Sequence, residues 1–213
     1  MAGVLVHDGD YQDRPARSPA PVYALGRHGR RPSEAELTAR VGMVIFLGSW
    51  AMLFLALFFA YALVRARSAG WPPPGVPRLP RLLPGLNTAV VAASSVAMVI
   101  AVRAGELGRA HAAARALAAA AALGVAFIGL QGVVWSDLWS AGLLPDGGPF
   151  PSVFYAFTTF HALHVLVGLV ALAGLALRAH AGKVRGGSVR LWGWYWHFVT
   201  LVWAALYVTL YLA

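Results

Sequence analysis

The stretch TTFHALHVLVGL, residues 158–169, places two histidines three residues apart inside a run that is otherwise almost entirely apolar. Histidines in such a run serve as metal ligands, as steps of a proton path, or as hydrogen-bonding groups between helices. Which of these roles applies depends on whether the run lies in water or in a lipid bilayer.

The composition of the chain indicates a membrane protein. Of its 213 residues, 59% are hydrophobic and 12% are charged, whereas soluble domains carry about 25% charged residues. The net charge of +9 fits basic cytoplasmic loops of a membrane protein, so no nucleic-acid partner is expected. The absence of cysteine excludes disulfides, thiolate metal sites and cysteine nucleophiles.

Five stretches have about the 20 apolar residues that a helix needs to cross a bilayer. They cover residues 39–64, 86–102, 114–134, 152–177 and 191–212. The sequence therefore predicts an all-α fold, an integral membrane bundle of five transmembrane helices over residues 37–213. A polar N-terminal tail, residues 1–36, precedes it, and the capping-box spacing of Ser33 and Glu36 predicts a helix start there.

Two connections have the composition of loops. The segment WPPPGVPRLPRLLPG, residues 71–85, contains six prolines, which remove backbone donors and fix φ. It is expected to form an extended strap along one membrane face. The segment DLWSAGLLPDGGPFP, residues 137–151, has turn chemistry.

The distribution of basic residues predicts the orientation. Thirteen Lys and Arg residues lie in the tail and in the two loops on its side, against four on the opposite side. Because cytoplasmic loops carry the excess of basic residues, the N-terminus is expected in the cytoplasm and the C-terminus outside. Aromatic residues near the span ends are expected to anchor the helices at the membrane interfaces: Trp71, Trp135, Trp139, Trp194, Tyr195 and Trp196.

The predicted spans contain no carboxylate, since all eight acidic residues fall in the tail or in loops. Proton pumps and ion-coupled transporters place such groups on their pathways, which disfavours a transporter. The remaining polar residues are expected to form structural contacts between helices: Gln131, Thr158, Thr159, His161, His164, His197 and Thr200.

Haem binding by these histidines is disfavoured on geometric grounds. His161 and His164 lie on one face of one helix, so both cannot be axial ligands of one haem. His164 and His197 differ in expected depth by about 10 Å. A stand-alone b-type cytochrome or a small transporter built on these histidines remains an alternative.

Several segments together resemble subunit III of the haem-copper oxidases, the cytochrome c oxidase family. FYAFTTFHALHVLVGLVAL (154–172) and WYWHFVTLVWAALYVTLYL (194–212) are similar to its signature spans. GMVIFLGSWAMLFLALFFAY (42–61), WPPPG (71–75), LNTAVVAASSVAM (86–98) and LGVAFIGLQ (123–131) follow in the family order. The resemblance covers about residues 40–213 and corresponds to the five-span form of the family.

Three positions depart from the family pattern. Trp50, Val134 and Thr200 stand where the family usually has membrane-embedded acids. Proton-relay roles tied to those acids therefore do not carry over, and their loss leaves open how proton uptake is affected.

The resemblance implies an accessory, cofactor-free subunit of a terminal cytochrome c oxidase, with no catalytic residues of its own. The haems and copper would belong to partner subunits I and II, and phospholipid is the ligand left for this chain. The expected location is the cell inner (plasma) membrane, with membrane lipids as further partners. A subunit III-like chain of a nitric oxide reductase is the other respiratory alternative.

Overall fold

The described part of the computed structural model, residues 33–71, 73, 76–77 and 79–212, is built of helices and contains no strand. Residues 1–32 of the predicted tail lie outside it. The helices are α1 (Glu34–Arg67), α2 (Leu82–Glu106), α3 (Ala110–Ser140), α4 (Pro149–His180) and α5 (Gly186–Tyr207), which the π-helical turn η1 (Val208–Leu212) extends. All five are long and apolar enough to cross a membrane, which confirms the predicted all-α membrane bundle.

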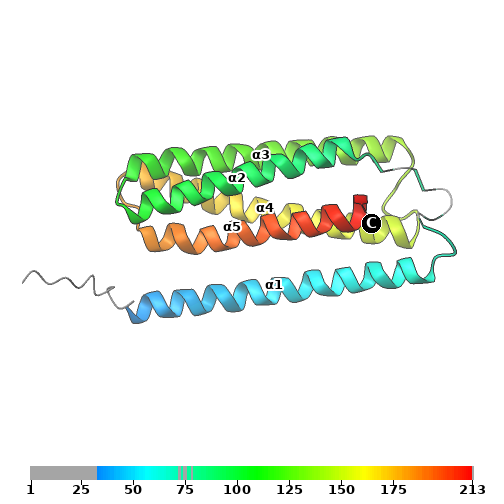
Figure 1. Ribbon diagram of the computed structural model, residues 1–213, viewed down its shortest axis with the longest axis horizontal. Helices are drawn as coiled ribbons and strands as arrows, with labels where there is room; N and C mark the ends of the chain where they lie inside the picture. Colours follow the sequence, from blue (N-terminus) through cyan, green and yellow to red (C-terminus); the bar gives the residue numbers. More distant parts are fainter. Residues whose placement is uncertain (1–32, 72, 74–75, 78, 213) are drawn as a thin grey trace, which may run out of the picture. The chain divides into compact units, whose positions relative to one another are not determined.

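Four of the helices close into a ring. α2 packs on α3, α3 on α4, α4 on α5, and α5 returns to α2. Successive helices run in opposite directions, so the start of α1 and the end of α5 lie at opposite ends of the bundle (Figure 1). Short loops between antiparallel neighbours are the usual connection in such bundles.

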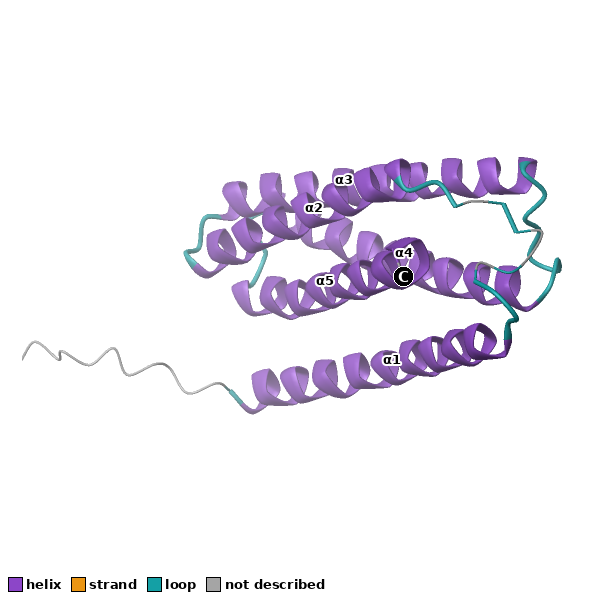
Figure 2. Ribbon diagram, turned by 45° about the vertical axis from the view of Figure 1, so that its right-hand side comes forward, coloured by secondary structure: helices purple, strands orange, loops and turns teal. Residues whose placement is uncertain are grey.

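α1 lies outside this ring along α4 and α5 (Figure 2). Only 6% of its most apolar window is buried. Aromatic rings make several of its contacts: Trp50 and Phe54 meet His164, and Phe58 and Tyr61 meet Phe157. One interhelical hydrogen bond adds to them, from the Tyr61 hydroxyl to the carbonyl of Thr209 at 2.9 Å.

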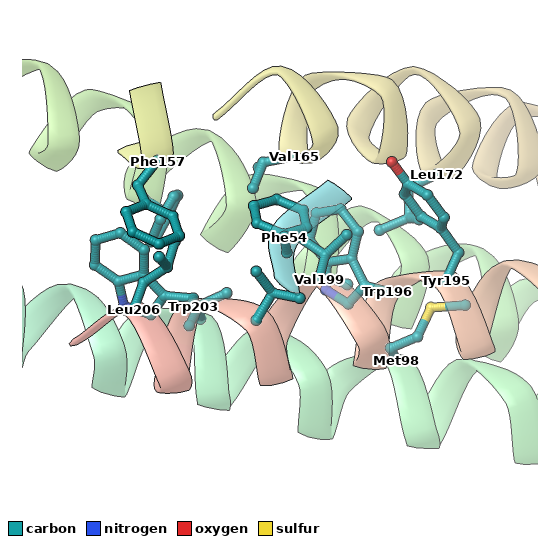
Figure 3. Packing of buried hydrophobic residues seen from close by; sticks show 14 of the residues in the cluster. Phe54, Met98, Phe157, Val165, Leu172, Tyr195, Trp196, Val199, Trp203 and Leu206 are labelled. Carbon is teal, nitrogen blue, oxygen red and sulfur yellow. The ribbon is translucent and has the colours of Figure 1, made fainter. Parts of the chain in front are cut away.

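Large aromatic side chains fill the core of the ring (Figure 3). Trp196 of α5 occupies the space that two glycines leave on the facing helices. A Cβ at Gly124 would come within 2.9 Å of the Trp196 ring, and one at Gly168 within 2.6 Å. Because any larger residue at these positions would collide with the indole, the two glycines allow α3 and α4 to close around it.

Each helix begins before its predicted span, and the first four helices also end after it. α2 begins at Leu82, so the last four residues of the segment 71–85, expected to be an extended strap, are helical. Pro84 lies in the first turn of this helix. A proline is tolerated there, since the amide hydrogen that it lacks has no partner within the helix. Two residues beyond the ends of α2, α3 and α4 lies a glycine with positive φ, and the amide after it closes the last helical turn: Gly108, Gly142 and Gly182.

Candidate functional site

The polar residues inside the bundle form hydrogen bonds that join the helices of the ring. The Trp196 Nε1–H group donates to Ser94 Oγ at 2.9 Å, and the Ser94 hydroxyl donates to the carbonyl of Ala120 at 2.8 Å. Trp196 and Ser94 are both buried. This relay connects α5 to α2 and α2 to α3 with every donor satisfied.

Two further bonds repeat the contact between α5 and α2. Ser95 Oγ lies 2.6 Å from His197 Nδ1, and Trp203 Nε1–H donates to Thr88 Oγ1 at 2.9 Å. The step of seven residues from Trp196 to Trp203 along α5 matches the step of six from Ser94 back to Thr88 along α2. The bonds therefore fix the antiparallel register of these two helices over two turns.

Thr158 joins α3 to α4, since its Oγ1 accepts a hydrogen bond from Trp135 Nε1 at 3.1 Å. Thr200 donates to the carbonyl of Trp196 within its own helix at 3.0 Å. Thr159 is exposed on the outer surface of α4. Of the three threonines singled out from the sequence, Thr158 thus has a hydrogen bond to another helix.

The His164 ring hydrogen-bonds within its own helix. Its Nδ1 donates to the carbonyl of Phe160 at 2.5 Å, and because a carbonyl can only accept, Nδ1 carries the proton. The interhelical bond at this position uses the His164 carbonyl instead, which accepts from the Tyr195 hydroxyl at 2.9 Å. His164 Nε2 has no hydrogen-bond partner among the described residues.

His161 lies in an aromatic cage and forms no hydrogen bond with the described residues. Its side chain is 1% exposed, and neither ring nitrogen has a partner there. The centroids of the Phe127 and Trp203 rings lie 5.5 and 5.3 Å from its own, and that of Phe54 lies 6.5 Å away. His161 thus contacts three helices through its ring faces and edges.

Three more buried polar side chains have no hydrogen-bond partner for at least one atom within the described residues: Asn87, Gln131 and Tyr211. Gln131, singled out from the sequence as a helix-joining residue, lies in the core of α3 and is 1% exposed. These side chains come from α2, α3 and the π-helical turn after α5.

The aromatic residues expected at the interfaces divide into two groups. Trp139 and Trp194 are 54% and 37% exposed. Trp71 and Trp135 are partly buried, and the Arg65 guanidinium lies 5.4 Å from the Trp71 ring centroid. Tyr195 and Trp196 are each 1% exposed and face the interior of the bundle. Their rings fill the core and supply donors, a role that proximity to a span end does not reveal.

The described residues contain no group of three His, Asp or Glu side chains that could hold a metal ion. Four acidic residues that the sequence placed in the tail or in loops fall within helices, but each lies in a terminal turn: Glu34, Glu36, Glu106 and Asp137. The middle of each helix therefore has no carboxylate.

Comparison with known proteins identifies the family of this chain. The family model for cytochrome c oxidase subunit III matches residues 24–213. The chain belongs to this family. Cytochrome c oxidase subunit 3 of Synechocystis sp. is 34% identical over 199 residues, covering 90% of this chain and 81% of the relative. The Arabidopsis thaliana protein of the same name is 32% identical over 192 residues, covering 86% and 71%, and that of Formosania lacustris is 36% identical over 181 residues, covering 81% and 68%.

The structure shows the surroundings of two of the positions at which the sequence was expected to depart from the family pattern. Trp50 places its ring edge-on to His164 with centroids 4.0 Å apart. Val134 is fully buried in α3. Both side chains are thus packing groups of the bundle.

Sequence reasoning missed Trp196 and Trp203 as the main donors of the bundle. From the sequence, Trp196 is expected only as an interfacial anchor, and Trp203, Ser94 and Thr88 are assigned no role. The matched spacing of donors on α5 and acceptors on α2 is the signal that could have paired them. That spacing becomes informative only once the two helices are known to be antiparallel neighbours.

Proposed function

We propose that this chain is the accessory membrane subunit of a terminal cytochrome c oxidase, where it packs against subunit I and stabilises the catalytic core that subunits I and II form. The observation that carries the proposal is the subunit III family match, which spans residues 24–213 and includes all five helices. The oxidation of cytochrome c and the reduction of oxygen take place in the partner subunits.

The interior of the bundle supports a structural role. Six of its side chains take part in hydrogen bonds between helices: Thr88, Ser94, Trp135, Thr158, Trp196 and Trp203. Mid-helix carboxylates, which proton-conducting membrane proteins place on their pathways, do not occur in the described helices. As the resemblance to subunit III implies, we assign the haems and copper of the complex to the partner subunits and phospholipid as a ligand to this chain.

The subunit is a multi-pass membrane protein, and we place it in the cell inner (plasma) membrane with its N-terminus in the cytoplasm. The support is the excess of Lys and Arg in the tail and in the two loops on its side. With that orientation the loops after α2 and α4 lie in the cytoplasm, and the C-terminal π-helical turn lies at the outer surface.

The test is purification through an affinity tag on this chain in a mild detergent, followed by a visible absorption spectrum and identification of the bound subunits by mass spectrometry. We expect the absorption bands of a-type haem and peptides of subunits I and II. A control preparation from cells that carry the untagged chain should yield neither.

Three other results would contradict the proposal in different ways. A catalytic partner with non-haem iron in place of copper would make the chain a nitric oxide reductase subunit. A colourless protein without partners would remove the oxidase assignment. A solitary protein with a b-type Soret band would make His161, His164 and His197 haem ligands.

A further inference from the structure

A groove of about 660 Å³ lies between α3 and α4 at the end of the bundle where α3 begins and α4 ends. Its apolar walls are mostly alanines, at 114, 118 and 121 on α3 and at 173 and 176 on α4, and Leu177 of α4 completes them. Ala118 and Ala173 are exposed, so the groove opens to the surface that faces lipid. Small side chains on both helices leave a channel that larger residues would have filled.

The mouth of the groove carries basic side chains from both helices. His111 and Arg115 lie one turn apart on α3, and His180 of α4 faces His111 with ring centroids 6.2 Å apart. Among the described residues that line the groove, none is acidic. The acid that ends α2, Glu106, lies 3.5 Å from Arg190 of α5, in a different part of the bundle end.

The length of the groove corresponds to one leaflet. His111 and Ala121 are ten residues apart on α3, which is about 15 Å along a helix. The hydrocarbon core of a bilayer is about 30 Å thick. A groove of this length with its basic mouth at the level of the headgroups would place the alanine channel along the acyl chains of that leaflet.

We propose that this groove binds one anionic phospholipid, with its phosphate held by His111, Arg115 and His180 and an acyl chain lying over the alanines. Charge selects the occupant, because the mouth is basic and the channel is apolar. Basic pockets between transmembrane helices are typical binding places for anionic lipid headgroups. The proposal rests on the proposed function, since it gives a place and a headgroup class to the phospholipid assigned to this chain, and it fails separately from the oxidase assignment because lipid retention and co-purified subunits are measured independently.

A second hollow at the same end, between α2 and α5, provides an internal comparison. Its volume is about 340 Å³, and its lining includes Arg103 and Arg190 together with Glu106. Since Glu106 and Arg190 form an ion pair, one of the two arginines there is already neutralised. The groove between α3 and α4 is the larger of the two hollows and has no acid in its lining.

The test is native mass spectrometry of the tagged chain, together with the partners that accompany it, purified in mild detergent. The sample is first stripped of lipid and then incubated with either phosphatidylglycerol or phosphatidylcholine. The wild-type chain is expected to retain one phosphatidylglycerol and little phosphatidylcholine. Arg115→Gln should weaken this retention about fivefold, the effect of one basic residue near an anionic lipid surface, while Arg103→Gln, at the same bundle end, should leave it unchanged.

A second pair of variants blocks the channel without changing the charge. Ala118→Leu with Ala173→Leu fills the groove with apolar side chains on exposed positions that face lipid, so the bundle is expected to fold normally. Gly129→Leu adds similar bulk on an exposed part of α3 where no atom lies within 4 Å of a new Cβ. The double variant should lose the bound phosphatidylglycerol, and Gly129→Leu should keep it.

The proposal is overturned if the wild-type chain retains no phosphatidylglycerol, or if it retains phosphatidylcholine equally well. It is also overturned if Arg103→Gln lowers retention as much as Arg115→Gln does, because the attraction would then come from the whole basic end. Retention by the filled double variant would likewise exclude the groove as the binding place.

Discussion

Replacing His161 by leucine tests the role of the aromatic cage. The imidazole is 1% exposed, and neither nitrogen has a hydrogen-bond partner among the described residues. A buried polar group without a partner costs about 1–3 kcal/mol. Loss of the ring contacts with Phe127 and Trp203 removes about 0.5–1.5 kcal/mol of aromatic interaction. The expected net effect of His161→Leu therefore ranges from a loss of about 0.5 to a gain of about 2.5 kcal/mol in the free energy of unfolding.

The matched control is His197→Leu, because His197 is bonded across the helix pair. Its Nδ1 lies 2.6 Å from Ser95 Oγ, and interhelical hydrogen bonds of this kind contribute about 0.6 kcal/mol on average and up to about 1.7. We expect His197→Leu to lower the free energy of unfolding by an amount in that range. The changes in the free energy of unfolding caused by His161→Leu and His197→Leu should thus differ in sign or at least in size.

The assay is unfolding of the purified subunit by sodium dodecyl sulfate in mixed micelles, followed by near-ultraviolet circular dichroism of the tryptophans. The reasoning fails if His161→Leu destabilises the protein as much as His197→Leu does. Such a result would mean that the His161 nitrogens are hydrogen-bonded in the membrane, through water or through a partner subunit, and that the imidazole is more than a packing group.

Three further predictions concern the contacts between helices, each measured by the same unfolding assay. Ser94→Ala leaves the buried Trp196 indole N–H without its acceptor and should cost about 1–3 kcal/mol; an unchanged midpoint would show that the relay does not stabilise the ring. Gly168→Ala introduces a methyl group 2.6 Å from the Trp196 ring and should cost about 1–3 kcal/mol through overpacking, whereas the exposed Gly174→Ala should be neutral or stabilising. Thr158→Val removes the acceptor of Trp135 at constant shape and should cost about 0.6–1.7 kcal/mol; a stabilised variant would contradict the 3.1 Å contact.

The number and order of the helices could be predicted because apolar runs and proline-rich turns report directly on membrane crossing. The helix ends could not. The run at 114–134 became a helix from Ala110 to Ser140, since a helix can continue beyond the hydrocarbon into the headgroup region, where polar residues are tolerated. Hydropathy detects the part of a helix that lies in hydrocarbon and no more.

The sequence could predict that the buried polar side chains form contacts between helices, but it could not predict which residues they contact. The sequence indicates that buried Ser, Thr and His side chains need hydrogen bonds, but a pairing such as Ser95 with His197 depends on which helices are neighbours and in what register. His161 shows the limit most clearly, because aromatic rings from three helices surround it and exclude the polar groups that it was expected to meet. That arrangement results from packing, which the spacing within one helix does not encode.

The place of α1 outside the ring has a consequence for the order of synthesis. Its neighbours α4 and α5 are the last helices to leave the ribosome, so α1 must remain in the bilayer without them while more than eighty further residues are made. A helix can do this because all of its backbone groups bond internally, and residues 41–64 of α1 contain no charged side chain. The strongly apolar character of α1 thus suits a helix that is inserted first and docked last.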